Sequence, residues 1–231
     1  MASVSQPIER RRARNQVVKP RPRDTVDRIL RAAAQEFCTK GLLGGSIEQI
    51  SRSAGTTKQL VYYYFKSKEQ LYTTVLDEVS AQSVQDLLPG QYHQMGPLDA
   101  LQRFIEGVFD QHVNRPTLAG LVLDQNLHQC AHMTHRNKFT AKASQVMEIL
   151  ADIIRRGVAA GTIRADVRAD YLYVTICMLT SGYFTSPIVV SMAFPEPNLQ
   201  DTEQVARWRA YAVSFILNSI RPYGATPSPI V

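Results

Sequence analysis

Three helix-start signals follow one another between residues 46 and 67, and they restrict the possible folds more than any other part of the chain. Ser46 and Ser67 each have a glutamine three positions later, which is the pattern of a capping box. Thr57 can cap a short helix between them, and Ala54-Gly55-Thr56 is typical of a tight turn. Two short capped helices joined by a glycine turn predict a helix-turn-helix unit.

Apolar residues recur at helical spacing on both sides of this unit. A first helix is expected from Asp24 or Thr25 to a stop at Gly41. The helices expected further on cover residues 67–79, 98–115, 118–128, 138–156, 170–186 and 204–220. The chain has no convincing alternating strand pattern and no internal repeat. We therefore predict an all-α fold of about nine helices.

The second short helix of the unit has two different sides. At 100° per residue, one arc of about 140° holds Lys58, Gln59, Tyr62 and Tyr63. Leu60, Val61 and Tyr64 point the other way and can pack on the preceding helices. A cation, an amide and two phenols suit phosphates and base edges in a DNA major groove, and the helix N-terminus adds a phosphate-binding end. The alternative is that the tyrosines are core residues and Lys58 is a solvated surface residue.

All of the net charge is concentrated at the N-terminus. Residues 1–23 contain seven basic residues and one acidic residue, which leaves residues 24–231 with 19 of each. This arm has three prolines and few large apolar residues, so we expect it to be disordered, with a polyanion as its natural partner. Nucleic acid and an anionic membrane surface both fit that description, and a solvated tail with no partner is the alternative.

The segment SIEQISRSAGTTKQLVYYYFKSKEQLYTTVL resembles the DNA-binding domain of the tetracycline-repressor (TetR) family of bacterial regulators. The resemblance covers residues 24–80 and implies a DNA-binding head of three helices plus the start of a fourth, followed by a ligand-binding and dimerisation body. Carried over by position, the residues that face the operator would be Thr57, Lys58, Gln59, Tyr62 and Tyr63, with Lys68 holding a phosphate. Ser46, which starts the preceding helix, is added to this set. Thr56 stands where the family often has a small hydrophobic residue.

The body is expected to hold a small-molecule effector. The candidate contacts are Phe104, Val108, Asp124, His128 and His132. On one continuous helix Asp124, His128, His132 and His135 would share an arc of about 80° and could bind a transition metal. The spacing of family members instead ends the helix near His128, which would separate the four. Effector contact, metal binding and a structural or surface role all stay open for this cluster, and no metal site is assigned.

An uncharged run covers residues 171–195 and is long enough to span a bilayer. It contains many Ser and Thr residues, and Pro187 interrupts it, so we interpret it as a buried or interfacial helix and expect no membrane partner. The last helix carries aromatic residues one heptad apart. We predict that these two helices form a homodimer interface. Its candidate residues are Tyr171, Ile176, Leu179, Trp208 and Phe215.

Motifs of catalysis are missing from the sequence. It has no HExxH or GxSxG, and the glycine-rich stretch at residues 41–46 lacks the Gly-Lys-Ser/Thr of a phosphate loop. The three cysteines lie far apart without CxxC spacing, which favours free thiols in the cytoplasm over a zinc site. We expect neither an enzyme nor a cofactor.

These observations predict three parts: a disordered basic arm at 1–23, a helix-turn-helix DNA-binding domain at 24–70, and an effector-binding and dimerisation domain at 71–225. The function that they favour is a cytoplasmic transcriptional regulator, most simply a repressor released from a palindromic double-stranded operator by a small-molecule effector. The alternatives are a regulator without a small effector and a metal-responsive regulator.

Overall fold

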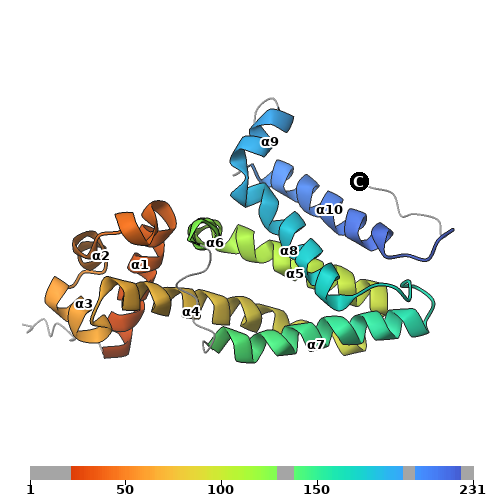
Figure 1. The fold of residues 1–231 in the computed structure, drawn as a ribbon, viewed down its shortest axis with the longest axis horizontal. Coiled ribbons are helices and arrows are strands. Elements are labelled where there is room, and N and C mark those ends of the chain that lie inside the picture. The colour runs from red at the N-terminus through yellow and green to blue at the C-terminus, as the bar shows by residue number, and fades with distance from the viewer. Residues whose placement is uncertain (1–21, 129–137, 195–200, 225–231) are drawn as a thin grey trace, which may run out of the picture.

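The computed structural model describes residues 22–128, 138–194 and 201–224. Within these ranges the chain forms ten α-helices, two short 3-10 turns and no strand (Figure 1). The first helices are α1 (Pro22–Gly44), α2 (Ile47–Ser53), α3 (Lys58–Phe65) and α4 (Lys68–Leu87). The turns are η1 (Leu88–Gly90) and η2 (Tyr92–Gln94). The later helices are α5 (Pro97–Asn114), α6 (Thr117–Leu127), α7 (Lys138–Ala159), α8 (Ala169–Thr185), α9 (Pro187–Ala193) and α10 (Thr202–Ser219). The all-α prediction is confirmed.

The three predicted helix starts are present. The hydroxyl oxygens of Ser46, Thr57 and Ser67 each accept a hydrogen bond from the backbone N–H three residues further on, at 3.3, 3.2 and 3.0 Å. Between the first two, Gly55 has a φ of +62°, which glycine adopts without strain. Each of these local bonds fixes the start of a helix, namely α2, α3 or α4. The short α2 and α3, joined by the turn at Gly55, have the geometry of a helix-turn-helix unit.

The two larger of the three hydrophobic clusters in the described residues define a head and a body. The head cluster joins α1, α2 and α3 to the first half of α4, and it continues past the expected boundary at residue 70 as far as Leu76. The body cluster draws on Val84 and Leu87 of the same helix and on α5, α7, α8 and α10. Figure 1 shows α4 leaving the head and running beside α7. The head and the body therefore share one continuous helix.

A second connection is made by α6, which packs along α1. Gly120 of α6 lies so close to α1 that an added Cβ would overlap the carbonyl oxygen of Cys38. Gly41, the predicted stop of α1, has a φ of +64° and kinks the helix, and its Cα faces the carboxylate of Asp124. Both glycines allow a close approach of α6 to α1 that a larger residue would prevent. The head is therefore joined to the body in two ways, through the shared helix α4 and through the contact of α6 with α1.

The uncharged run is divided by a sharp bend. Pro187 begins α9 directly after α8 ends, and the two helix axes differ by 79°. This extra break is the reason that the chain has ten described helices where about nine were expected. No single described helix is long and apolar enough to span a membrane, and only this bent pair passes by length and composition.

Candidate DNA-binding surface and internal cavity

The two sides predicted for α3 are present in the structure. Val61 and Phe65 are buried in the head cluster, and Leu60 and Tyr64 are half-buried. The residues on the opposite side are exposed: Thr57, Lys58, Gln59, Tyr62 and Tyr63. The two tyrosines keep 46% and 68% of their surface exposed, which is uncommon for large aromatic residues in a head with its own core. Bulky amphipathic groups and a cation therefore project together from one helix.

An ion pair modifies the charge of this surface. The ammonium of Lys58 lies 2.9 Å from Glu48 Oε2 of α2, and Arg52 approaches the same carboxylate at 3.5 Å. The hydrogen bond from Lys58, followed by its charge and that of Arg52, lowers the pKa of Glu48. An ionised carboxylate thus lies among the groups expected to meet phosphates. A phosphate at this surface would compete with Glu48 for the ammonium of Lys58.

Lys68 and Ser46 already have partners inside the protein. The Lys68 ammonium donates to the carbonyl oxygens of Leu43 (3.1 Å) and Gly45 (3.2 Å), and it thereby ties the end of α1 to the start of α4. An ammonium has three donors, so one is left for a phosphate. Ser46 uses its hydroxyl oxygen as the cap of α2. Phosphate binding by both residues stays a prediction.

The structure adds Lys66 to the candidate DNA-binding residues. Lys66 has a φ of +59° at the C-terminal end of α3. Its ammonium donates to the carbonyl oxygen of Tyr63 at 3.0 Å and lies 5.5 Å from the centre of that ring. An exposed cation is therefore held beside an exposed phenol. Its position directly after α3 was the sequence signal for it.

A cavity of about 240 Å³ lies in the body among α4, α5, α6, α7 and α8. Of the candidate effector contacts on α5, Val108 lines it, whereas Phe104 is fully buried in the body cluster and is not one of the lining residues. The lining also includes Gln111 and His112, which follow Val108 on the same helix. Sequence reasoning missed His112, although Phe104, Val108 and His112 recur every four residues on one stripe of α5.

Asp124 and His128 are not among the lining residues of this cavity. Because α6 packs on α1, Asp124 turns toward the head, where the buried Tyr72 of α4 donates a hydrogen bond to Asp124 Oδ2. Gln125 Nε2 donates to the same Tyr72 oxygen at 2.6 Å, and His128 Nε2 lies 3.7 Å from Asp124 Oδ1. The predicted effector contacts are therefore separated, and Asp124 belongs to the junction of head and body.

The metal alternative gains no support from the described part of the chain. No group of three or more His, Cys, Asp or Glu side chains there is close enough to hold a metal ion. The predictions for His132 and His135 fall outside the described residues.

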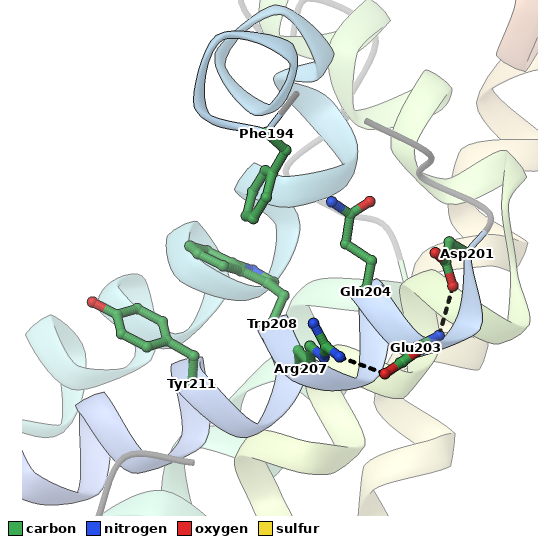
Figure 2. Close-up of a pocket in the computed structure, with 7 residues that line it drawn as sticks. All are labelled: Phe194, Asp201, Glu203, Gln204, Arg207, Trp208 and Tyr211. Atoms are coloured by element: carbon green, nitrogen blue, oxygen red, sulfur yellow. Dashed lines mark hydrogen bonds and ion pairs between the residues drawn. The ribbon is translucent and has the colours of Figure 1, made fainter. Parts of the chain in front are cut away.

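A larger pocket of about 490 Å³ opens at the start of α10 (Figure 2). Phe194 and Trp208 face each other across it, and Trp208 also stacks on Tyr183 and Tyr211 with ring centres 5.6 and 5.4 Å apart. The polar side of the pocket carries Asp201, Glu203, Gln204 and Arg207. A stack of aromatic rings thus runs from the buried Tyr183 of α8 through Trp208 to the exposed Tyr211 of α10.

Family models match both parts of the chain. "Bacterial regulatory proteins, tetR family" matches residues 29–75, and "Tetracyclin repressor-like, C-terminal domain" matches residues 97–216. The chain belongs to the TetR family of transcriptional regulators. The repressor NicS of Pseudomonas putida is 30% identical over 85% of this chain and 92% of its own. The repressor KstR2 of Mycolicibacterium smegmatis is 30% identical over 66% of this chain and 74% of its own.

Solved structures agree with the TetR fold. The ketosteroid transcriptional regulator KstR2 of Mycobacterium tuberculosis has a TM-score of 0.63 to this chain at 19% identity, and the match covers 91% of this chain and 100% of its own. The putative regulator SCO4942 of Streptomyces coelicolor has a TM-score of 0.62 at 23% identity, over 86% and 99% of the two chains. The head and body described above therefore share the fold of these two solved structures.

One of the predicted dimer-interface residues of this TetR-family chain does not lie on its surface. Ile176 is fully buried inside its own protomer, because that side of α8 packs on α5. Tyr171 and Phe215 are 66% and 44% exposed, whereas Leu179 and Trp208 are half-buried. The other large exposed apolar residues of α8, α9 and α10 are Val174, Met178, Ile188, Val189, Met192 and Tyr211. We call these six residues with Tyr171 and Phe215 the apolar face.

Proposed function

We propose that this regulator is a repressor that binds a palindromic operator as a homodimer and leaves it when a small-molecule effector fills the body. The observation that carries the proposal is the set of exposed groups on α3, which offers hydrogen-bond donors and acceptors at the rim of a helix-turn-helix unit. Base-edge contacts from such a helix specify sequence, while contacts to phosphates position it. The site of action is the cytoplasm, where bacterial operators lie.

The homodimer is supported by the apolar face. Tyr171, Val174 and Met178 recur at i, i+3 and i+7 along α8, and more than half of each side chain is exposed. Large apolar side chains exposed along one side of a helix indicate an interaction site in a protein of ordinary composition. A second copy of the chain would bury the same surface on both sides and would present two α3 helices to two half-sites about 34 Å apart.

Release by an effector requires two states that bind the effector with different affinity. The shared helix α4 and the contact of α6 with α1 join the cavity-lining helices to the head. A ligand that moves α6 or the second half of α4 therefore changes the position of the head. This connection supports an effector-dependent repressor over one without an effector.

The proposal is tested by selecting binding sites for the full chain from random double-stranded DNA. We expect a palindromic consensus, and we expect sedimentation of the complex to give two subunits per selected site. The control selection uses the Lys58→Ala, Gln59→Ala double variant, which should enrich no consensus. A wild-type selection without a palindrome, or one subunit per site, would contradict the proposal.

A further inference from the structure

Among the residues that line the body cavity, His112 carries the one fully buried side-chain nitrogen or oxygen without a hydrogen-bond partner in the described structure. Gln111 Nε2 donates to the backbone carbonyl of Ser83 at 2.7 Å, and the Ser83 hydroxyl accepts from Arg115 at 3.3 Å. His112 keeps only 8% of its surface exposed, and its Nδ1 has no hydrogen-bond partner among the described residues. A buried nitrogen of this kind is a vacant hydrogen-bonding position, because burial without a partner is unfavourable.

The imidazole ring is held in place rather than free to turn. It stacks on Phe184 of α8 with ring centres 5.4 Å apart and planes 14° apart. Burial lowers the pKa of His112 to about 4, so the ring is neutral at neutral pH. A neutral imidazole has one nitrogen that donates and one that accepts, and a hydroxyl group can pair with either.

The lining favours an uncharged ligand. No Asp, Glu, Lys or Arg side chain is among the 14 lining residues, half of which are aliphatic or methionine. The nearby guanidinium of Arg115 is paired with Asp86. A carboxylate or ammonium group that entered would lose its hydration without gaining a counter-ion.

The volume favours a compact ligand. About 240 Å³ is below the range of roughly 300–1,000 Å³ for pockets that hold drug-sized molecules. The apolar walls come from α4, α5, α6 and α7, for example Val84, Val108, Val122 and Val146. A molecule with a single ring fits this space better than a long chain or a fused polycyclic compound.

We infer that the cavity takes a compact, uncharged, largely apolar compound with one hydroxyl group, of the size of a simple phenol, and that His112 Nδ1 pairs with that hydroxyl. The inference rests on the proposed effector response and names the chemical class of the effector. An analogue without the hydroxyl leaves the nitrogen unsatisfied and binds more weakly.

The test compares three probes of nearly equal size by isothermal titration calorimetry on the full chain. They are p-cresol, p-xylene, which lacks the hydroxyl, and p-toluate, which is charged. For the wild type we expect p-cresol to bind about 10-fold more tightly than p-xylene, the factor for one net hydrogen bond, and p-toluate not to compete with it.

The variant His112→Phe retains an aromatic ring for the stack with Phe184 and removes the nitrogen. It should lose most of the preference for p-cresol over p-xylene. The matched control His93→Phe replaces an exposed histidine in η2 and should leave that preference unchanged. Circular dichroism checks that each variant is folded, and the wild-type comparison of p-cresol with p-xylene needs no variant.

Equal affinity of the wild type for p-cresol and p-xylene would overturn the inference. Tightest binding of p-toluate, no binding of any probe at millimolar concentration, or an undiminished preference in a folded His112→Phe protein would overturn it too. Operator binding is measured on the same samples without probe. A wild type that binds its operator but no probe contradicts the inference alone, whereas a wild type that binds no operator contradicts the proposed function.

Discussion

The contact of Tyr72 with Asp124 predicts a large effect from removing one oxygen atom. Tyr72 is fully buried, and its ring meets Phe37 edge to face with centres 5.1 Å apart. Tyr72→Phe keeps this ring contact and deletes the hydroxyl, which donates to Asp124 and accepts from Gln125. The variant therefore isolates the polar part of the junction between head and body.

The magnitude follows from what the deletion leaves behind. The Asp124 side chain is only 10% exposed, so its carboxylate would lose a hydrogen bond that water does not easily replace. A hydrogen bond to a charged group contributes about 1.5–3 kcal/mol, and the bond from the buried Gln125 amide adds about 1 kcal/mol. We expect Tyr72→Phe to lower the free energy of unfolding by roughly 2–4 kcal/mol.

The assay is unfolding in urea followed by circular dichroism. The matched control is Tyr64→Phe, because the half-buried Tyr64 belongs to the same cluster and its hydroxyl makes no hydrogen bond with the described residues. The control should change stability by less than about 0.5 kcal/mol. A double-mutant cycle with Asp124→Asn measures the coupling directly. Equal effects of the two tyrosine variants, or no coupling in the cycle, would refute the reasoning.

Three further outcomes are expected. Glu48→Gln should raise affinity for operator and random DNA alike in fluorescence-anisotropy titrations, because it removes a negative charge beside Lys58; unchanged affinity would contradict this. Because burial lowers the folded pKa of His112 from 6.5 to about 4, the unfolded chain takes up a proton first as the pH falls between these values. Wild-type stability should therefore drop over this window by up to about 3 kcal/mol more than that of His112→Phe, measured as urea midpoints against pH, and parallel profiles would exclude the effect. Deleting residues 1–21, with six basic residues, should flatten the slope of log K against log salt by about 3 per subunit if half of them meet phosphates, whereas parallel salt plots would indicate a solvated tail.

The head was predictable because its determinants are local. Ser46, Thr57 and Ser67 fix their helix starts through bonds that span three residues, and Gly55 fixes the turn between two of them. The exposed side of α3 followed from the helical period alone. Such features need no knowledge of distant packing, so a single sequence was enough.

The body was less predictable because its contacts depend on packing between distant helices. Asp124 meets Tyr72, 52 residues earlier in the chain, only because Gly120 lets α6 lie close against α1. The apolar run of α8 has no polar stripe to tell its inner side from its outer side, so Ile176 was assigned to the wrong side. His112 was not predicted as a cavity-lining residue, because one polar residue on an apolar helix stripe carries no sequence signal that distinguishes a cavity from solvent.

Sequence-specific DNA binding through α3 is the central claim, and titration of the selected operator tests it most directly. Lys58→Ala and Gln59→Ala should each weaken binding to the operator by about 1–3 kcal/mol while changing binding to random DNA much less. Arg155→Ala, which removes an exposed cation from α7 in the body, is the control and should bind both DNAs like the wild type. The account is contradicted if both α3 variants bind the operator as tightly as the wild type.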